Sequence, residues 1–133
     1  MLNPIEQAKS ILQDENKTEK ERGNAAHYLG ENGNEESGYV LVSALDDDDY
    51  GVHWAASEGL ARLGEAAMPA LLKALADPNC SRRVIHGAKH VFHTSSPNVR
   101  KEAAGLLQAM HDSAQDIAIM QGASELITKL RLA

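Results

Sequence analysis

Three histidines at spacings of four and three residues, His86, His90 and His93, are the best placed in this sequence to do chemistry. On a helix they share one face, and two histidines four residues apart can chelate zinc. His53, His111 or an acidic side chain would have to supply a fourth ligand. The alternative is a solvated helix face, or histidines that are hydrogen-bonded across a groove between helices, because the motif contains no carboxylate and no HExxH pattern. The sequence leaves both interpretations open.

The acidic run Asp46–Asp49, followed by Gly51, also has a chemical interpretation. A calcium loop of the EF-hand type that begins at Asp46 needs an oxygen ligand where Tyr50 stands and a bidentate glutamate where Ser57 stands. Both positions fail this requirement. The simpler prediction is that the run caps the following helix, since carboxylates accept hydrogen bonds from the free N–H groups of a helix N-terminus.

No pattern identifies a catalytic residue or a cofactor. Cys80 is the only cysteine, and the sequence contains neither a GxSxG motif nor a glycine-rich phosphate loop. An internal disulfide is therefore impossible, which fits a cytoplasmic location. There is no run of about 20 apolar residues and no basic-plus-apolar leader, so we expect neither a membrane span nor a signal peptide.

The charge of the chain limits its partners. A net charge of -6 argues against a protein that binds the nucleic-acid backbone. Five basic residues nevertheless lie close together in the sequence: Arg82, Arg83, Lys89, Arg100 and Lys101. We expect them to pair with Asp and Glu of adjacent helices. A patch for an anion or an acidic partner is the alternative.

The elements that must position these residues are clearest in the stretch Asp46–Asp77. Apolar or small residues recur there at steps of three and four, first at Val52, Ala55, Ala56, Gly59, Leu60 and Leu63, then at Ala67, Met68, Leu71, Leu72 and Leu75. This spacing predicts two amphipathic helices. Gly64 lies between them and suits a left-handed position after the first helix. His53, Trp54 and Ser57 fall off the first apolar stripe.

Copies of this unit recur along the chain. The end of its second helix reads LVSALDD at 41–47, LLKALAD at 71–77 and LLQAMHD at 106–112, with a weaker echo, LITKLRL, at 126–132. In the first helices, Ala25 aligns with Ala56 and Leu29 with Leu60. We expect one α-solenoid domain over 1–133, with a capping helix at 1–17, repeats at 18–47, 48–78 and 79–112, and a short last repeat at 113–133.

The composition favours an all-α fold, because only 4% of the residues are aromatic and strands prefer aromatic and β-branched residues. Cap residues support the same conclusion: Asn3 precedes Pro4, Thr18 precedes Glu21 by three residues, and Ser96 precedes Pro97. We expect roughly nine helices, at residues 3–14, 18–31, 35–45, 49–63, 66–76, 81–93, 97–110, 113–120 and 123–131.

The repeated unit resembles HEAT-like repeats of the kind shared with phycobilin lyases. The resemblance rests on the Asp-rich turn, the VxxAA of Val52–Ala56, the GLARLG of Gly59–Gly64 and the LLxAL–Asp ending. The later segments VRKEAAGLLQAM and IAIMQGASELITKL resemble an armadillo repeat, in which a glycine turn precedes the third helix. The resemblance implies a right-handed α-α superhelix of about four helical repeats. The sequence departs from the HEAT-like pattern at His53, where arginine is usual.

The resemblance implies a protein-interaction or scaffold module that binds another protein or peptide and has no catalysis of its own. Ser43, Lys73 and Gln108 occupy equivalent positions off the stripes of the second helices, and we expect that row to face the partner. Tyr39 and Trp54 are candidate aromatic anchors. No nucleic acid, membrane or cofactor is expected.

The alternative function is a metal- or tetrapyrrole-linked enzyme or lyase of the same scaffold, centred on His86, His90 and His93. Deoxyhypusine hydroxylase, an enzyme with HEAT-like repeats, binds iron through His-Glu pairs, but this sequence has none, and His53 is followed by Trp54. The sequence therefore does not decide whether the protein is an enzyme, and the missing His-Glu pairs argue against it. The short apolar last helix, with Leu126, Ile127, Leu130 and Leu132, leaves a homodimer open.

Overall fold

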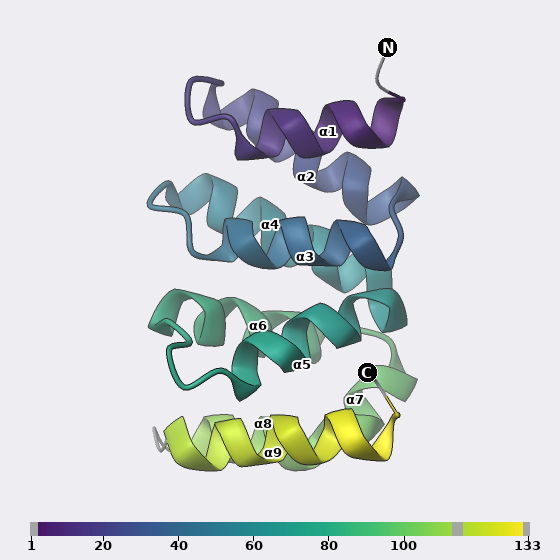
Figure 1. Cartoon of the computed structure of the whole chain (residues 1–133), viewed down its shortest axis with the longest axis vertical. Helices are drawn as coiled ribbons and strands as arrows, with labels where there is room; N and C mark the ends of the chain where they lie inside the picture. Colours follow the sequence, from purple (N-terminus) through teal and green to yellow (C-terminus); the bar gives the residue numbers. More distant parts are fainter. Residues whose placement is uncertain (1–2, 113–115, 132–133) are drawn as a thin grey trace.

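The chain folds into helices that stack in two layers along one long axis (Figure 1). The computed structural model describes residues 3–112 and 116–131. In chain order the elements are α1 (Pro4–Gln13), α2 (Glu19–Asn32), α3 (Glu35–Leu45), α4 (Tyr50–Leu63), the 3-10 helix η1 (Gly64–Ala67), α5 (Met68–Ala76), α6 (Arg82–Thr94), α7 (Pro97–Glu102), α8 (Ala104–Asp112) and α9 (Asp116–Lys129). No described residue lies in a strand. The predicted all-α solenoid is confirmed, and the right-handed sense of the superhelix stays a prediction.

Side-chain caps set the helix starts, as the sequence predicts. Asn3 accepts the N–H of Glu6 at 2.8 Å at the start of α1. Thr18 and Glu21 form a reciprocal capping box on α2, with Glu21 N to Thr18 Oγ1 at 3.1 Å and Thr18 N to Glu21 Oε1 at 3.2 Å. Each bond satisfies an N–H group that has no partner inside the helix. Gly64 ends α4 with φ 60°, which confirms the left-handed position predicted for it.

The two layers alternate along the chain. Helices α1, α3, α5 and α9 pack on one another in sequence, and α2, α4, α6 and α8 form the second layer behind them (Figure 1). The predicted stripes fill the space between the layers: Val52, Ala56 and Leu60 of α4, and Leu71 and Leu72 of α5, are fully buried. Burial of this continuous core stabilises a stack whose single helix pairs expose too much apolar surface to fold alone.

Two glycines allow a close approach of α2 and α4. A Cβ atom added to Gly30 of α2 would lie 2.7 Å from both the Cα and the carbonyl oxygen of Gly59 in α4. A Cβ atom added to Gly59 would lie 2.7 Å from the carbonyl oxygen of Ala26. Because the obstructing atoms belong to the backbone, they cannot move aside as a side chain does. The contact of α2 with α4 therefore depends on glycine at both positions.

The C-terminal third differs from the expected helices. The single helix expected at 97–110 breaks at Ala103 into α7 and α8. Val99, Ala103 and Leu106 are all buried on either side of this break. Gly105, a weak helix former, directly follows the break.

The two helices expected at 113–120 and 123–131 also differ from the structure. Within the described residues they are one helix, α9, and residues 113–115 lie outside these. Gly122 continues that helix instead of forming a turn, and its missing side chain admits Leu106, whose Cδ1 atom would lie 3.3 Å from a Cβ.

The apolar residues of α9 are used within the fold. Leu126 is buried, and Ile127 and Leu130 pack against the core, while Leu132 lies outside the described residues. The homodimer through this helix stays a prediction. Among the described residues, no helix combines the length and the apolar character that crossing a bilayer requires.

Candidate partner-binding surface

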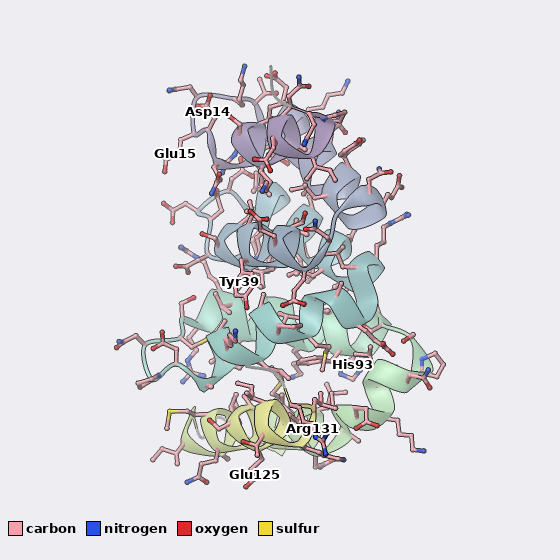
Figure 2. The ribbon with its side chains drawn as sticks, turned by 45° about the vertical axis from the view of Figure 1, so that its right-hand side comes forward. Asp14, Glu15, Tyr39, His93, Glu125 and Arg131 are labelled. Carbon is pink, nitrogen blue, oxygen red and sulfur yellow. The ribbon has the colours of Figure 1, made fainter. Side chains whose placement is uncertain are left out.

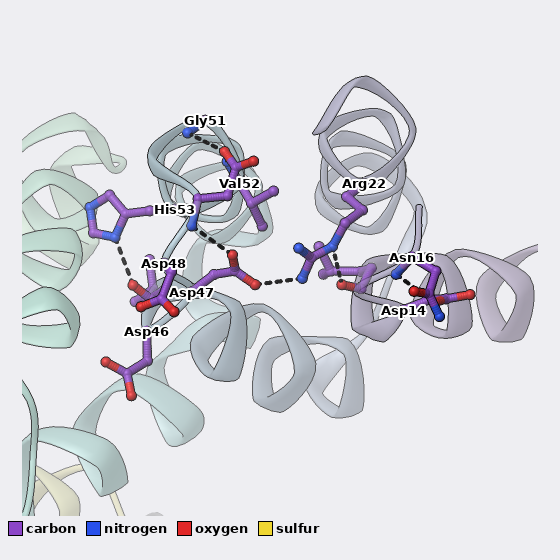
Figure 3. A network of polar contacts seen from close by, with 12 residues as sticks. Asp14, Asn16, Arg22, Asp46, Asp47, Asp48, Gly51, Val52 and His53 are labelled. Carbon is purple, nitrogen blue, oxygen red and sulfur yellow. Dashed lines mark hydrogen bonds and ion pairs between the residues drawn. The ribbon is translucent and has the colours of Figure 1, made fainter. Parts of the chain in front are cut away.

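The acidic turn between α3 and α4 is bound to α2 (Figure 3). Arg22 of α2 donates from Nη2 to Asp47 Oδ2 at 2.5 Å and from Nε to the Leu12 carbonyl oxygen at 3.0 Å. Asp47 Oδ1 also accepts the N–H of Asp49 at 2.8 Å. The side chains of Arg22 and Asp47 are 9% and 17% exposed, so this ion pair is largely shielded from water. Through these two bonds, Arg22 joins α1, α2 and the acidic turn.

The same turn is bound to the repeat after it. Asp46 Oδ1 accepts from Ser81 Oγ at 2.7 Å, and Asp48 Oδ1 pairs with Arg83 Nη1 at 2.7 Å. Asp49 Oδ1 accepts the N–H of Gly51 at 2.9 Å, so the predicted cap of α4 is confirmed for this residue. The cap explains one of the four aspartates. The other three hold the repeats in register.

The pKa of the Asp47 carboxyl lies below its ordinary value. Burial alone raises the pKa, but the hydrogen bonds from Arg22 and from the Asp49 N–H, with the charges of Arg22 and Arg83, outweigh burial and lower it. Because the folded-state pKa is depressed, the stability from this carboxylate is fully present above about pH 4 and is lost as the pH falls through the folded-state pKa.

Replacing Asp47 with asparagine should therefore lower the free energy of unfolding by about 1.5–3 kcal/mol at pH 7, the value of a hydrogen bond to a charged group. The difference from the wild type should shrink as the pH falls from about 4 to about 2, where the wild-type carboxylate also becomes neutral. Urea denaturation of both proteins at several pH values measures this. A difference that stays constant across that range contradicts the role given to the Asp47 charge.

His53 of α4 takes the position that Arg22 has in α2. Its Nδ1 lies 2.7 Å from the Leu45 carbonyl oxygen near the end of α3, as Arg22 Nε bonds Leu12 near the end of α1 (Figure 3). Since a carbonyl only accepts, Nδ1 carries the hydrogen. His53 is 3% exposed, and Ser57 is also buried, donating to the His53 carbonyl oxygen at 3.2 Å. The expectation that both residues lie off the buried face is wrong, because each finds a hydrogen-bond partner inside.

Aromatic and imidazole rings of α4 and α6 lie together next to His53. The Trp54 ring lies 5.6 Å from that of His86 and 4.9 Å from that of His90, both nearly edge-on, and 5.8 Å from the ring of Tyr50. Tyr50 is 66% exposed, and Trp54 is half-buried. A pocket of about 330 Å³ opens beside them, lined by Asp47, Asp48, Tyr50, His53, Arg82, Arg83 and His86. We call Tyr50, Trp54, His86 and His90 the aromatic cluster.

The three histidines of the predicted metal site do not share one contact. His86 and His90 pack on Trp54, whereas exposed His93 lies near the turn between α6 and α7 (Figure 2). Among the described residues, no three His, Cys, Asp or Glu side chains are grouped so as to hold a metal ion. The side chain of His111, the fourth ligand considered, lies outside the described part. His86 and His90 lie against the Trp54 ring, and the metal site stays a prediction.

The predicted row on the second helices is partly brought together. Lys73 Nζ of α5 lies 3.0 Å from the hydroxyl oxygen of Tyr39 in α3 and 5.6 Å from the centre of its ring. Ser43 is exposed on α3, where it lines a separate polar pocket with the acidic turn. Gln108 lies on α8, in the other layer, because α9 and not α8 packs on α5. It lines a pocket of about 410 Å³ with Arg100 and Lys101.

Sequence reasoning missed the state of the basic residues. Arg83 pairs with Asp48, but Arg82, Lys89, Arg100 and Lys101 form no ion pair with the side chains described in residues 3–110 and 117–131. The expectation that they pair with acids of adjacent helices holds only for Arg83. The sequence shows that no Asp or Glu occurs between residues 78 and 101, but this does not decide whether acids from other helices pair with these cations.

Comparison with known proteins places the repeats in a family. A sequence model of HEAT repeats matches residues 5–91, which is more than half of the 133-residue chain. This segment runs from α1 into α6 and includes both the acidic turn and the aromatic cluster. No curated protein and no solved structure matches the chain.

Proposed function

Because the chain belongs to the HEAT repeat family, we propose that it is a scaffold module that binds a partner protein and has no catalytic activity of its own. The surface proposed for the partner is the aromatic cluster of α4 and α6. HEAT repeats commonly mediate contacts between proteins, since stacked helices present an extended surface.

One observation carries the proposal: the only tryptophan of the chain is half-buried and packed among other rings, of which Tyr50 and His86 are exposed. Tyr50, Trp54 and Arg82 are of the residue types that dominate binding energy at protein interfaces, and Arg82 lies on the rim of the adjoining pocket. A solvent-exposed ring cluster costs free energy by leaving apolar area in water, so burial by a partner is favourable.

The pair Tyr39 and Lys73, on α3 and α5, supports a second surface. These are the second helices of the repeats, which we expect from the repeat alignment to face the partner. Tyr39 is 41% exposed, and its ring is held in place by the ammonium group. An aromatic ring that is already ordered loses less conformational entropy on binding. This surface faces away from the aromatic cluster, in the other layer, so the two can be tested separately.

Affinity purification of the partner with alanine variants tests the proposal. Trp54→Ala should weaken binding by at least about 2 kcal/mol, which is more than tenfold, as for a hot-spot residue. Tyr50→Ala, at a side chain that is 66% exposed, should weaken binding without lowering the free energy of unfolding. Tyr28→Ala on α2 is the matched control, since this exposed tyrosine lies outside the cluster.

The outcomes separate the surfaces and the alternative function. Loss of binding in Tyr39→Ala alone assigns the partner to α3 and α5 and removes the aromatic cluster from the proposal. Bound metal in the purified protein, together with a melting temperature that falls on adding a chelator, supports the metal-linked enzyme at His86, His90 and His93 instead.

A further inference from the structure

The outward side of α6 is a basic face in an acidic protein. Residues 78–101 contain five Lys and Arg, three His and no Asp or Glu, whereas residues 1–50 contain twelve Asp and Glu against four Lys and Arg. On α6 the buried positions are Val84, Gly87, Ala88, Val91 and Phe92. The remaining positions place the charged and imidazole side chains together on the opposite side of the helix.

We define the α6 face as Arg82, His86, Lys89, His90 and His93, continued on α7 by Arg100 and Lys101. Arg82, His86 and His93 are exposed, and Lys89 and His90 are half-buried. A two-residue connection separates α6 from α7 in the sequence. The 13 residues of α6 span about 20 Å.

The positive charge of this face is not neutralised by ion pairs among the described side chains. Other basic groups of the chain do form such pairs: Arg22 with Asp47, Arg62 with Glu31, and Lys129 with Glu102. On the α6 face, Arg82, Lys89, Arg100 and Lys101 form no ion pair with any described residue. Acidic side chains are abundant elsewhere in the chain. These four cations therefore lack ion pairs because of their position in the fold.

We infer that the α6 face binds an acidic segment of the partner protein, with an apolar or aromatic side chain of that segment seated on Trp54. The inference rests on the proposed function and names the chemistry of the partner. Carboxylates of the segment pair with Arg82 and Lys89 on either side of the ring cluster, and an extended stretch of about six residues spans α6 at about 3.3 Å per residue.

Further along, the same segment reaches the pocket of about 410 Å³ that Pro97, Arg100, Lys101, Ala104, Leu107 and Gln108 line on α7 and α8. Its apolar side chains and the cations Arg100 and Lys101 resemble the combination of Trp54 with Arg82 and Lys89 at the other end of the face. A nucleic acid fits this face less well, because its phosphate chain extends beyond α6 and meets the acidic first half of the molecule.

Fluorescence anisotropy with a defined probe tests the inference. The probe is a labelled peptide of about twelve residues, rich in glutamate, with one central phenylalanine. We expect salt-sensitive binding to the wild-type protein and an affinity at least about tenfold lower for Arg82→Glu/Lys89→Glu, because like charges then face each other. Trp54→Ala should lower the affinity as well. Lys17→Glu/Lys20→Glu, the same charge change on exposed residues before and in α2, should leave it unchanged.

Several outcomes overturn the inference. They are no binding of the peptide, equal binding by the Arg82→Glu/Lys89→Glu protein, equal binding of a lysine version of the peptide, or tighter binding of an oligothymidylate of matched charge. The failure of the proposed function is distinguishable. If binding of a captured partner depends on Trp54 but not on Arg82 and Lys89, only the inference about an acidic segment is wrong. If binding does not depend on Trp54, the proposed function is wrong.

Discussion

Arg22→Met lowers the free energy of unfolding by about 3–5 kcal/mol, the expected cost of removing one partner from a buried ion pair. The substitution keeps the apolar stem of the side chain but removes both hydrogen bonds, to Asp47 and to the Leu12 carbonyl oxygen. The carboxylate and the carbonyl then lose donors in a place where water replaces them poorly. Urea denaturation should show a lower midpoint at an unchanged slope, because the protein still folds to the same compact state.

The matched control is Arg62→Met. Arg62 also joins neighbouring helices of the same layer, through Glu31 at 3.0 Å, but these side chains are 59% and 55% exposed. Such an exposed pair is worth about 0–1 kcal/mol, so this variant should remain close to the wild type. Equal losses in the two variants contradict the special role of the buried pair in joining the repeats.

Gly30→Ala should destabilise the protein by at least about 2 kcal/mol, as overpacking of a tightly packed contact does. The added methyl group meets the backbone of Gly59 at 2.7 Å, so α2 and α4 have to move apart. That movement displaces α2, the helix that also carries Arg22 of the buried ion pair. Thermal or urea unfolding measures the loss.

Gly105→Ala is the control for Gly30→Ala, because a Cβ atom at Gly105 in α8 would have nothing within 4 Å. Alanine is the better helix former by about 1 kcal/mol, so this variant should be as stable as the wild type or more stable. Opposite signs for two identical substitutions identify packing, and not helix propensity, as the cause. If both substitutions lower the free energy of unfolding, the packing explanation is wrong.

Local signals in the sequence were sufficient for the fold up to α6. Caps such as Thr18 with Glu21 act within a few residues of the helix start, and so do the apolar steps of α4 and the glycine at position 64. These signals do not depend on how distant parts are packed. The helix starts, the all-α class and the stacked repeats were therefore predictable.

The C-terminal third was not predictable in the same way. The break at Ala103 and the continuation of α9 through Gly122 depend on which side chains reach the core from neighbouring helices, above all Leu106. Likeness of sequence placed LLQAMHD with the second helices, but packing puts α8 in the layer of the first helices. Tertiary contacts determine both the helix ends in this part and the layer in which α8 lies. A periodic pattern in the sequence carries no information about such contacts.

The candidate site was predictable in its residues but not in their arrangement. Trp54, His86 and His90 stand out by type and spacing, yet only the packing of α4 against α6 brings them into one cluster. The burial of His53 follows from its equivalence to Arg22, which the alignment of Ala25 with Ala56 already contains. The free cations of the α6 face required the structure, because pairing depends on distances across repeats.

Amide hydrogen exchange of the protein with and without its purified partner locates the binding surface. We expect slower exchange on binding in the first half of α4, around Tyr50–Trp54, and along α6. Exchange in α3 and α5 should change less. Protection confined to α3 and α5, with α4 and α6 unchanged, contradicts the claim that the aromatic cluster and the α6 face form the binding surface.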